Sequence, residues 1–311
     1  MLSSLIFSLV VKKIIRLQSN REFDEWIARL NRASNLRIED LYECGAILGE
    51  GYYSIVKSGR RKTLSDTLQN DDRVGKKSLA SNEQSLLSKH LGWNCALKII
   101  DKGLYWDLVI KEKERADSIV REVAVQATLL AEADDNPGFV RLLNFFETED
   151  KVVLELELLQ GRDLLKYLSS KGSVNESDAA HIMYDVLNCV VTMQERGIAH
   201  RDLKPANILM ADMTTNGVMV KLSDFGMADF VGPDNLLRGR CGTPGFVAPE
   251  IYEAGVHGGY ENHADMFSAG AILYTLLCGY EPFFADTDAK LIQENKNGKV
   301  SFPPDCWKTG A

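Results

Sequence analysis

Residues 200–207 read His-Arg-Asp-Leu-Lys-Pro-Ala-Asn, and residues 224–226, a short way further along the chain, read Asp-Phe-Gly. In the first run, Asp202 supplies a carboxylate that can accept a proton from an attacking hydroxyl. Asn207 and Asp224 supply oxygen ligands of the hard kind that Mg²⁺ prefers. Either run alone is weak evidence for a catalytic site, because a single acidic residue is usually a solvated surface group. Together they indicate phosphoryl transfer.

The order of the flanking motifs makes this pattern specific. Upstream, residues 49–56 read Gly-Glu-Gly-Tyr-Tyr-Ser-Ile-Val, residues 95–98 read Cys-Ala-Leu-Lys, and residues 121–122 read Arg-Glu. Downstream, residues 242–245 read Gly-Thr-Pro-Gly and residues 248–250 read Ala-Pro-Glu. Over about residues 40–307 the chain therefore resembles the eukaryotic protein kinases.

The resemblance implies an α+β fold with two lobes. We expect a kinase domain over residues 40–311, in which a small lobe at 40–156 consists of an antiparallel sheet and one helix. A larger, mostly helical lobe should occupy residues 160–311. Between the second and third strands, residues 61–92 are polar and lack apolar periodicity, so we interpret them as a disordered insertion.

Composition agrees with this expectation and narrows the class of protein. The 311 residues are 45% hydrophobic and 26% charged, which is enough for one large domain with sizeable cores. A net charge of −8 disfavours a general nucleic-acid binder and is compatible with basic peptide substrates. The six cysteines form no Cys-x-x-Cys pair, so they indicate neither a zinc knuckle nor a disulfide framework. A reducing, cytoplasmic location fits best.

The first 34 residues need a separate interpretation. The apolar run at residues 2–11 is too short to span a bilayer, and its positive charges follow it rather than precede it. Alternating apolar residues predict a strand pair, and a helix with Trp26 should follow. The Glu-Trp-Ile at 25–27 resembles the closing helix of a pleckstrin-homology domain, although ordinary helix packing explains it equally well. Phosphoinositide-binding loops would be absent from such a remnant, so we expect no membrane binding.

The glycine-rich run predicts a hairpin of residues 41–49 and 54–60 whose turn covers the phosphates of ATP. Gly49 and Gly51 let the backbone approach phosphate closely, and Ser54 replaces the third glycine of the family pattern, which should stiffen the loop. By the resemblance, Lys98 contacts the α- and β-phosphates. Further adenine and ribose contacts implied by the resemblance come from Leu48, Val56, Ala96, Leu156, the backbone of Glu157 and Leu159, Asp163 and Leu209.

A helix at about residues 118–131 should present Glu122 to Lys98, an ion pair that holds the lysine toward phosphate. One turn later, where the family normally packs an apolar residue into a column between the lobes, this chain has Gln126. The other members of that column would be Leu142, His200 and Phe225. A buried amide needs partners, so Gln126 should weaken the active position of the helix.

Lys204, two residues after the catalytic Asp202, resembles the Ser/Thr-specific class, and Thr243 supports the same assignment. The resemblance then implies a protein substrate with a Ser or Thr acceptor, with ATP and Mg²⁺ as cofactors. Residues 265–270 and 278–283 look most like the calcium/calmodulin-dependent kinase group, although the sequence contains no EF-hand loop. Ala206 replaces a glutamate that commonly contacts basic substrate residues, so the peptide preference is open.

Residues 227–242, here called the activation stretch, contain no Ser, Thr or Tyr. Many kinases receive an activating phosphate in this part of the chain, and Arg201 would then lack its usual phosphate partner. We therefore predict that activity does not require phosphorylation of the activation stretch.

The family normally continues past residue 311, so we expect the last helices of the large lobe to be missing. On that expectation Glu250 lacks a buried arginine partner, at a cost of roughly 3–5 kcal/mol. The apolar faces around Ile272, Leu273 and Leu276 would also be less covered. A second interpretation follows, in which the chain is a truncated, non-catalytic binding or regulatory fragment.

Overall fold

The computed structural model describes residues 37–62, 93–130, 138–214, 217–304 and 307. Backbone contacts divide the chain into two units, Met1–Asp117 with Arg141–Leu158 and Ser118–Val140 with Leu159–Ala311. The predicted pleckstrin-homology remnant at 1–34 lies outside the described residues, as does nearly all of the predicted insertion. Two residues of the predicted insertion are described: Arg61 ends β2 and pairs with Glu155, and the Lys62 amide donates to the Leu41 carbonyl at 2.8 Å.

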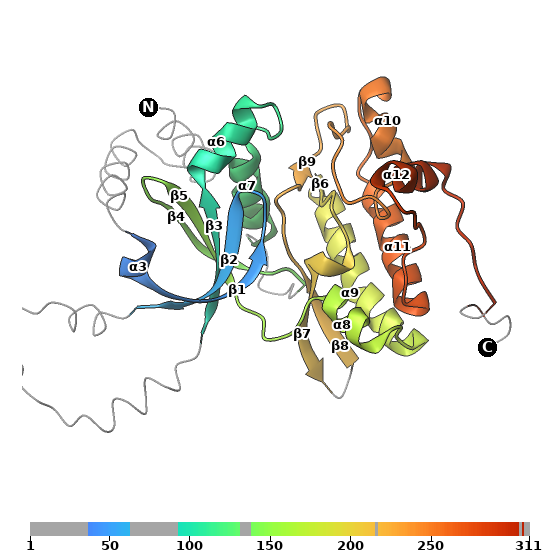
Figure 1. Ribbon diagram of the computed structural model, residues 1–311, viewed down its shortest axis with the longest axis horizontal. Helices are drawn as coiled ribbons and strands as arrows, with labels where there is room; N and C mark the ends of the chain where they lie inside the picture. Colours follow the sequence, from blue (N-terminus) through green and yellow to red (C-terminus); the bar gives the residue numbers. More distant parts are fainter. Residues whose placement is uncertain (1–36, 63–92, 131–137, 215–216, 305–306, 308–311) are drawn as a thin grey trace, which may run out of the picture. The chain divides into compact units, whose positions relative to one another are not determined.

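The first unit is built on a five-stranded antiparallel sheet (Figure 1). Its strands run in the order β1-β2-β3-β5-β4. Their bounds are β1 Tyr42–Glu50, β2 Ser54–Arg61, β3 Cys95–Asp101, β4 Leu142–Glu147 and β5 Lys151–Glu157. The antiparallel sheet predicted for the small lobe is therefore confirmed.

The two faces of this sheet carry different residues, because successive side chains of a strand alternate. Lys98 lies opposite Val56, and Ala96 lies opposite Leu156, so these four residues occupy one face. The opposite face carries an apolar cluster that includes Cys95, Leu97, Ile99, Tyr42 and Val153. Helix α3 (Ile38–Leu41) adds Ile38 to that cluster.

A helix that the sequence did not predict, α6 (Lys102–Ile110), follows β3 directly. Asp101 caps it by accepting a hydrogen bond from the Leu104 amide at 2.9 Å. Tyr105 is its one buried residue and packs edge-on against Tyr53 at 5.3 Å between ring centroids. Because only one of its residues is buried, the helix has no repeating pattern of apolar residues from which it could be recognised in the sequence.

The second unit is mostly helical. Its helices are α7 Ser118–Leu130, α8 Leu164–Lys171, α9 Glu176–Glu195, the short η1 Pro205–Asn207, α10 Pro249–His257, α11 Ala264–Cys278 and α12 Asp288–Asn297. Two small antiparallel pairs complete it, β6 Ile198–Ala199 with β9 Asp229–Phe230 and β7 Ile208–Thr214 with β8 Gly217–Leu222. None of the helices in the described ranges is long and apolar enough to cross a membrane.

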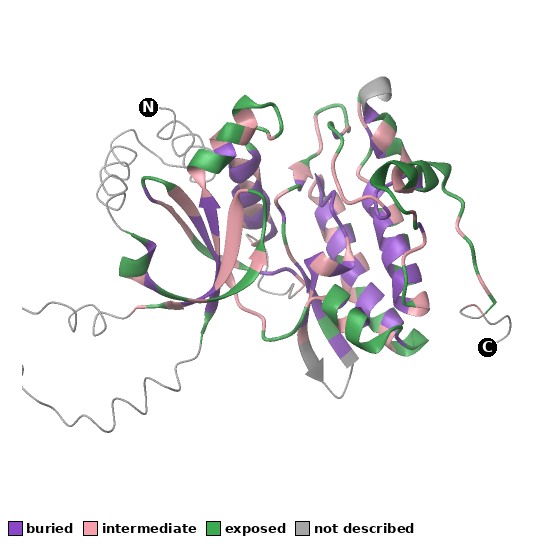
Figure 2. Cartoon of the chain, in the orientation of Figure 1, coloured by how far each residue is buried: buried purple, intermediate pink, exposed green. Residues whose placement is uncertain are grey.

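The core of the second unit runs along α9 and α11, where buried residues recur along the length of both helices (Figure 2). Ile272 and Leu276 on α11 are both 0% exposed, so the prediction that they would be poorly covered is wrong. Leu273 is 37% exposed, which agrees with the prediction for this residue. Glu250 is also exposed, so the predicted cost of a buried, unpaired carboxylate does not arise.

Helix α7 belongs to the second unit, although the sequence placed residues 118–131 in the small lobe. An ion pair between elements far apart in sequence joins α7 to this unit: Arg121 Nη1 of α7 lies 2.6 Å from Asp229 Oδ2 of β9. No local pattern signals such a long-range contact.

Candidate active site

Four polar residues predicted from the sequence meet in the second unit. Lys204 Nζ donates to Asp202 Oδ2 at 2.8 Å, and the Thr243 hydroxyl donates to Asp202 Oδ1 at 2.7 Å. Lys204 Nζ also donates to Thr243 Oγ1 at 2.8 Å. Asn207 Nδ2 donates to the Asp202 carbonyl at 2.8 Å and to its carboxylate at 3.2 Å. We call these four residues the catalytic cluster.

The cluster holds one carboxylate next to one ammonium group, with little solvent around the acid. Asp202 is 6% exposed. Its Oδ1 already accepts a hydrogen bond from a hydroxyl, that of Thr243, which is the same contact that an incoming Ser or Thr hydroxyl would make. The arrangement can therefore orient a hydroxyl, receive its proton and place a positive charge beside it.

A buried carboxylate fixes the backbone from which the cluster extends. Asp265, at the start of α11, accepts hydrogen bonds from the His200 amide at 2.7 Å and the Arg201 amide at 2.9 Å. Arg201 has φ 69°, in the left-handed region that non-glycine residues seldom adopt. Burial raises the pKa of Asp265, and the neighbouring His200 and Arg201 oppose that shift. The sequence had marked Asp265 only as part of a group-specific motif.

The two predicted metal ligands are joined through the backbone. The Ser223 amide and hydroxyl both donate to the Asn207 carbonyl, at 2.9 Å each, which places Asp224 one residue further on. Asn207 donates through Nδ2, so Oδ1 is the amide atom that can ligate a cation. Asp224 is exposed and has φ 58°. This donor set fits Mg²⁺.

Within the described ranges, no group of three or more His, Cys, Asp and Glu side chains could by itself hold a metal ion. Mg²⁺ sites commonly use one or two protein ligands and fill the remaining positions with water and substrate phosphates. Asn207 and Asp224 would therefore hold the ion together with a nucleotide.

Phe225 connects the metal-binding run to the core. It is 2% exposed, and its ring centroid lies 5.4 Å from that of His200 and 6.1 Å from that of Phe139. The structure thus brings together His200 and Phe225, two members of the predicted column. Leu142 belongs to the other unit, and its place in the column stays a prediction.

Gln126 is buried in α7, and its Oε1 has no hydrogen-bond partner among the described residues. The buried acceptor is therefore unsatisfied, and its effect on the active position of α7 stays a prediction.

Replacing Gln126 by Leu should raise the free energy of unfolding by about 1–3 kcal/mol, because it removes an unsatisfied buried acceptor. Urea denaturation measures this difference, with Gln293→Leu on the exposed face of α12 as the control. Equal or lower stability of Gln126→Leu would contradict the account.

The glycine-rich turn lies in the first unit, at the tip of β1 and β2. The Gly51 amide donates to the Ser54 carbonyl at 2.7 Å, and a Cβ at Gly51 would lie 2.8 Å from Ser54 Oγ. A Cβ at Gly49 would meet nothing within 4 Å, so its backbone is open to a ligand. The turn is therefore tight at Gly51 and accessible at Gly49, as a phosphate-covering loop requires.

Of the adenine contacts predicted in the first unit, Val56, Ala96 and Leu156 share one face of the sheet. Ala96 is buried, whereas Leu48 is 43% exposed. The Glu157 amide donates to the Arg141 carbonyl at 2.8 Å, so that amide is not available to a base.

The predicted ligand contacts of the second unit lie around the start of α8. Asp163 caps α8 by accepting from the Lys166 amide at 2.8 Å, and its backbone forms a bridge with Leu209. Asp163 thus has a helix-capping role in addition to the predicted ribose contact. Leu159 and Leu209 are both partly buried.

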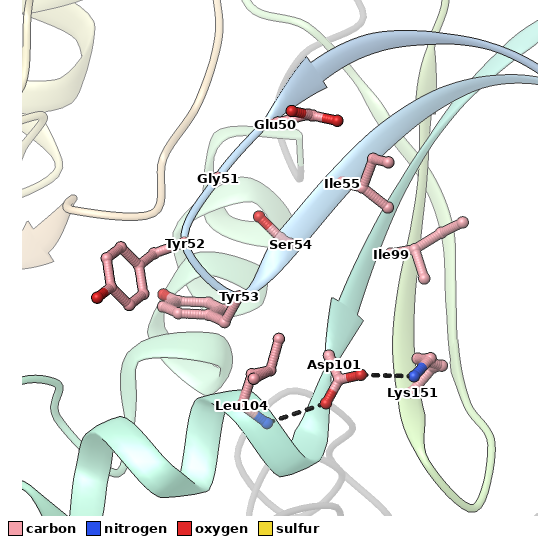
Figure 3. Close-up of a pocket in the computed structure, with 10 residues that line it drawn as sticks. All are labelled: Glu50, Gly51, Tyr52, Tyr53, Ser54, Ile55, Ile99, Asp101, Leu104 and Lys151. Carbon is pink, nitrogen blue, oxygen red and sulfur yellow. Dashed lines mark hydrogen bonds and ion pairs between the residues drawn. The ribbon is translucent and has the colours of Figure 1, made fainter.

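A pocket of about 330 Å³ lies beside the glycine-rich turn, but it is not the predicted nucleotide site (Figure 3). Gly51 and Ser54 line it, whereas Val56, Ala96 and Lys98 do not. Other lining residues are Ile55 and Ile99, which lie opposite each other on the reverse face of the sheet. Asp101 and Lys151, neighbours on adjacent strands, both line it and form an ion pair at 2.7 Å.

Lys98 and Glu122 fall in different units. Lys98 lies in the middle of β3, and Glu122 lies on α7, where it is 4% exposed. Their ion pair stays a prediction.

Comparison with known proteins gives a consistent result. A family described as "Protein kinase domain" matches residues 85–306. The chain is 30% identical over 279 residues to a "Probable myosin light chain kinase" of Dictyostelium discoideum, covering 90% of this chain and 61% of that protein. It is 30% identical over 270 residues to "Myosin light chain kinase A" of the same organism, covering 87% of this chain and 77% of that protein.

A third relative, "Calcium/calmodulin-dependent protein kinase type 1" of Macrobrachium nipponense, is 32% identical over 270 residues. That match covers 87% of this chain and 66% of the relative. The chain thus spans between 61% and 77% of the length of these three proteins.

Proposed function

The chain belongs to the protein kinase domain family, among the eukaryotic Ser/Thr kinases, and we propose that it transfers the γ-phosphoryl group of ATP to Ser and Thr hydroxyls of protein substrates. The observation that supports this most strongly is the catalytic cluster. In it, the Asp202 carboxylate accepts a hydrogen bond from a Thr hydroxyl at 2.7 Å, with the Lys204 ammonium group at 2.8 Å.

The residues of the cluster divide the work of the reaction. Asp202 orients the acceptor hydroxyl and receives its proton as the hydroxyl oxygen bonds to the γ-phosphorus; the bond from that phosphorus to the β,γ-bridging oxygen breaks, and ADP leaves. Lys204 balances the negative charge that develops beside it. Mg²⁺, when held by Asn207 and Asp224, would neutralise charge on the phosphates. In the first unit, Lys98 would contact the phosphates from β3, with the open backbone of Gly49 nearby in the hairpin.

Two further expectations belong to this proposal. Among the described residues, Cys44, Cys95, Cys189 and Cys241 are thiols rather than disulfides, which supports the reducing, cytoplasmic location expected from the sequence. The substrate should be a protein rather than a nucleic acid, as the acidic net charge suggests.

Isotope labelling separates transfer from simple nucleotide binding. The chain is incubated with a mixed protein substrate, Mg²⁺ and ATP labelled either at the γ- or at the α-phosphate. We expect label in the substrate only from γ-labelled ATP, and none after chelation of Mg²⁺. Binding of ATP without labelling would reject the proposal in favour of a non-catalytic fragment.

Asp224→Ala should weaken binding of ATP in the presence of Mg²⁺. The expected loss is at least about tenfold in Kd, since even the loss of an outer-shell partner commonly costs that much in metal affinity. Calorimetry measures this effect when ATP is titrated into each protein, once with Mg²⁺ and once with a chelator. The ATP affinities of the wild type and Asp224→Ala should differ only when Mg²⁺ is present. An equal difference in affinity in the presence of the chelator would show that Asp224 does not act through the ion.

A further inference from the structure

Arg201 precedes the catalytic Asp202 and has a fully engaged guanidinium group. Nε donates to Cys241 Sγ at 2.9 Å, and Nη1 donates to Asp229 Oδ2 at 2.9 Å. Nη2 donates to the carbonyls of Arg238 and Gly239, at 2.9 and 3.3 Å. All three guanidinium nitrogens of Arg201 thus donate hydrogen bonds to the activation stretch. This stretch contains no hydroxyl that could carry a phosphate.

Asp229, the carboxylate among these partners, forms an ion pair with a second arginine. Asp229 Oδ2 lies 2.6 Å from Arg121 Nη1 as well as 2.9 Å from Arg201 Nη1. The three side chains are 14%, 12% and 5% exposed, in the order Asp229, Arg121 and Arg201. Two guanidinium groups so close and so poorly solvated would repel each other without an anion between them.

The bridge joins two parts of the catalytic apparatus. Arg121 directly precedes Glu122 on α7, and Arg201 directly precedes Asp202. Asp229 itself lies in β9 and pairs with Ala199 of β6, and Ala199 directly precedes the catalytic loop, residues 200–207. One carboxylate therefore fixes α7, the catalytic loop and the activation stretch with respect to one another, all within the second unit.

We propose that Asp229 is a built-in substitute for an activating phosphate: a positioning residue that holds Arg201 and Arg121 so that the catalytic cluster is assembled without phosphorylation of the activation stretch. A phosphoryl group on that stretch would supply an anion to arginines of this kind. Here the carboxylate of the chain itself supplies it. The inference rests on the proposed function, because its readout is phosphoryl transfer.

Removal of the carboxylate should impair catalysis more than folding. In Asp229→Ala we expect kcat to fall by about 5- to 150-fold, the usual range of coupling between distinct sites. Asp229→Asn, which keeps the shape of the side chain, should show a similar loss, and Asp229→Glu should retain most activity. Asp234→Ala is the matched control, because Asp234 pairs with Arg238 on the exposed side of the same stretch; its kcat should equal that of the wild type.

Chemical rescue distinguishes an anion that positions arginines from a residue that only stabilises the fold. Sodium formate supplies the carboxylate that Asp229→Ala lacks, so it should raise the kcat of this variant but not that of the wild type. Sodium chloride at equal ionic strength should give no recovery. Phosphatase treatment of the wild type should leave kcat unchanged.

Three results would overturn the inference. The first is a kcat of Asp229→Ala equal to that of the wild type. The second is a low kcat of Asp229→Ala that formate does not raise, together with an equally low kcat of Asp229→Glu. The third is a fall in the kcat of the wild type on phosphatase treatment that is traced to a phosphate on Thr243. If Asp229→Ala does not fold, the comparison of Asp229→Glu with Asp229→Asn replaces it. A higher kcat in Asp229→Glu supports the inference, and equal kcat values overturn it. Failure of the proposed function is distinguishable, because the wild type itself would then transfer no phosphate.

Discussion

Asp202→Asn should reduce kcat by about 10²–10⁴-fold, the usual contribution of a positioned general base. Asparagine keeps the shape of the side chain and can still accept a hydrogen bond, but it cannot take up the proton of the acceptor hydroxyl. ATP binding should change little, because the predicted metal ligands are Asn207 and Asp224. Steady-state transfer and calorimetric ATP binding, measured on the same preparation, check the two halves of this expectation.

The control for Asp202→Asn is Asp286→Asn, an exposed carboxylate of the same unit. It removes the same charge from the protein and should leave both kcat and ATP affinity unchanged. An Asp202→Asn variant that turns over as fast as this control would remove Asp202 from the mechanism.

Asp265→Ala should cause the largest loss of stability among single substitutions near the site. The Asp265 carboxylate satisfies the buried amides of His200 and Arg201, and each orphaned donor costs about 1–3 kcal/mol. A domain of this kind is stabilised by only about 5–15 kcal/mol, so the loss is a large share of the total. Urea denaturation should show a clearly lower midpoint.

Asp265→Asn offers a graded comparison, because its one carbonyl oxygen can still accept one of the two hydrogen bonds. Its stability should lie between those of the wild type and Asp265→Ala. Asp286→Ala serves as the exposed control. If Asp265→Ala were as stable as this control, the carboxylate would not be holding the catalytic loop.

Much of the site could be predicted because many of its residues lie in short sequence motifs. Asp202, Lys204 and Asn207 lie within six residues of one another, and the backbone link through Ser223 brings in Asp224. Period-two alternation similarly explains why Ala96 and Lys98 share a face of β3. Local spacing was sufficient for the run 202–207 and for the face of β3, whereas the link through Ser223 spans 16 positions.

The features that escaped prediction depend on distant partners. Asp265 is 65 positions from His200, and Asp229 is 108 positions from Arg121, so neither contact leaves a periodic trace in the sequence. The wrong expectations for Ile272 and Leu276 had a different cause. They were inferred from helices that the family normally adds, whereas the neighbours already present bury both side chains.

A series of acceptor peptides tests the central claim most directly. Four peptides of identical sequence carry Ser, Thr, Tyr or Ala at one position, and phosphoryl transfer from ATP to each is followed by mass spectrometry. Our account predicts phosphorylation of the Ser and Thr peptides at that position and none of the Tyr or Ala peptides. Modification of the Tyr peptide at a rate equal to that of the Ser peptide, or of none of the four, would contradict it.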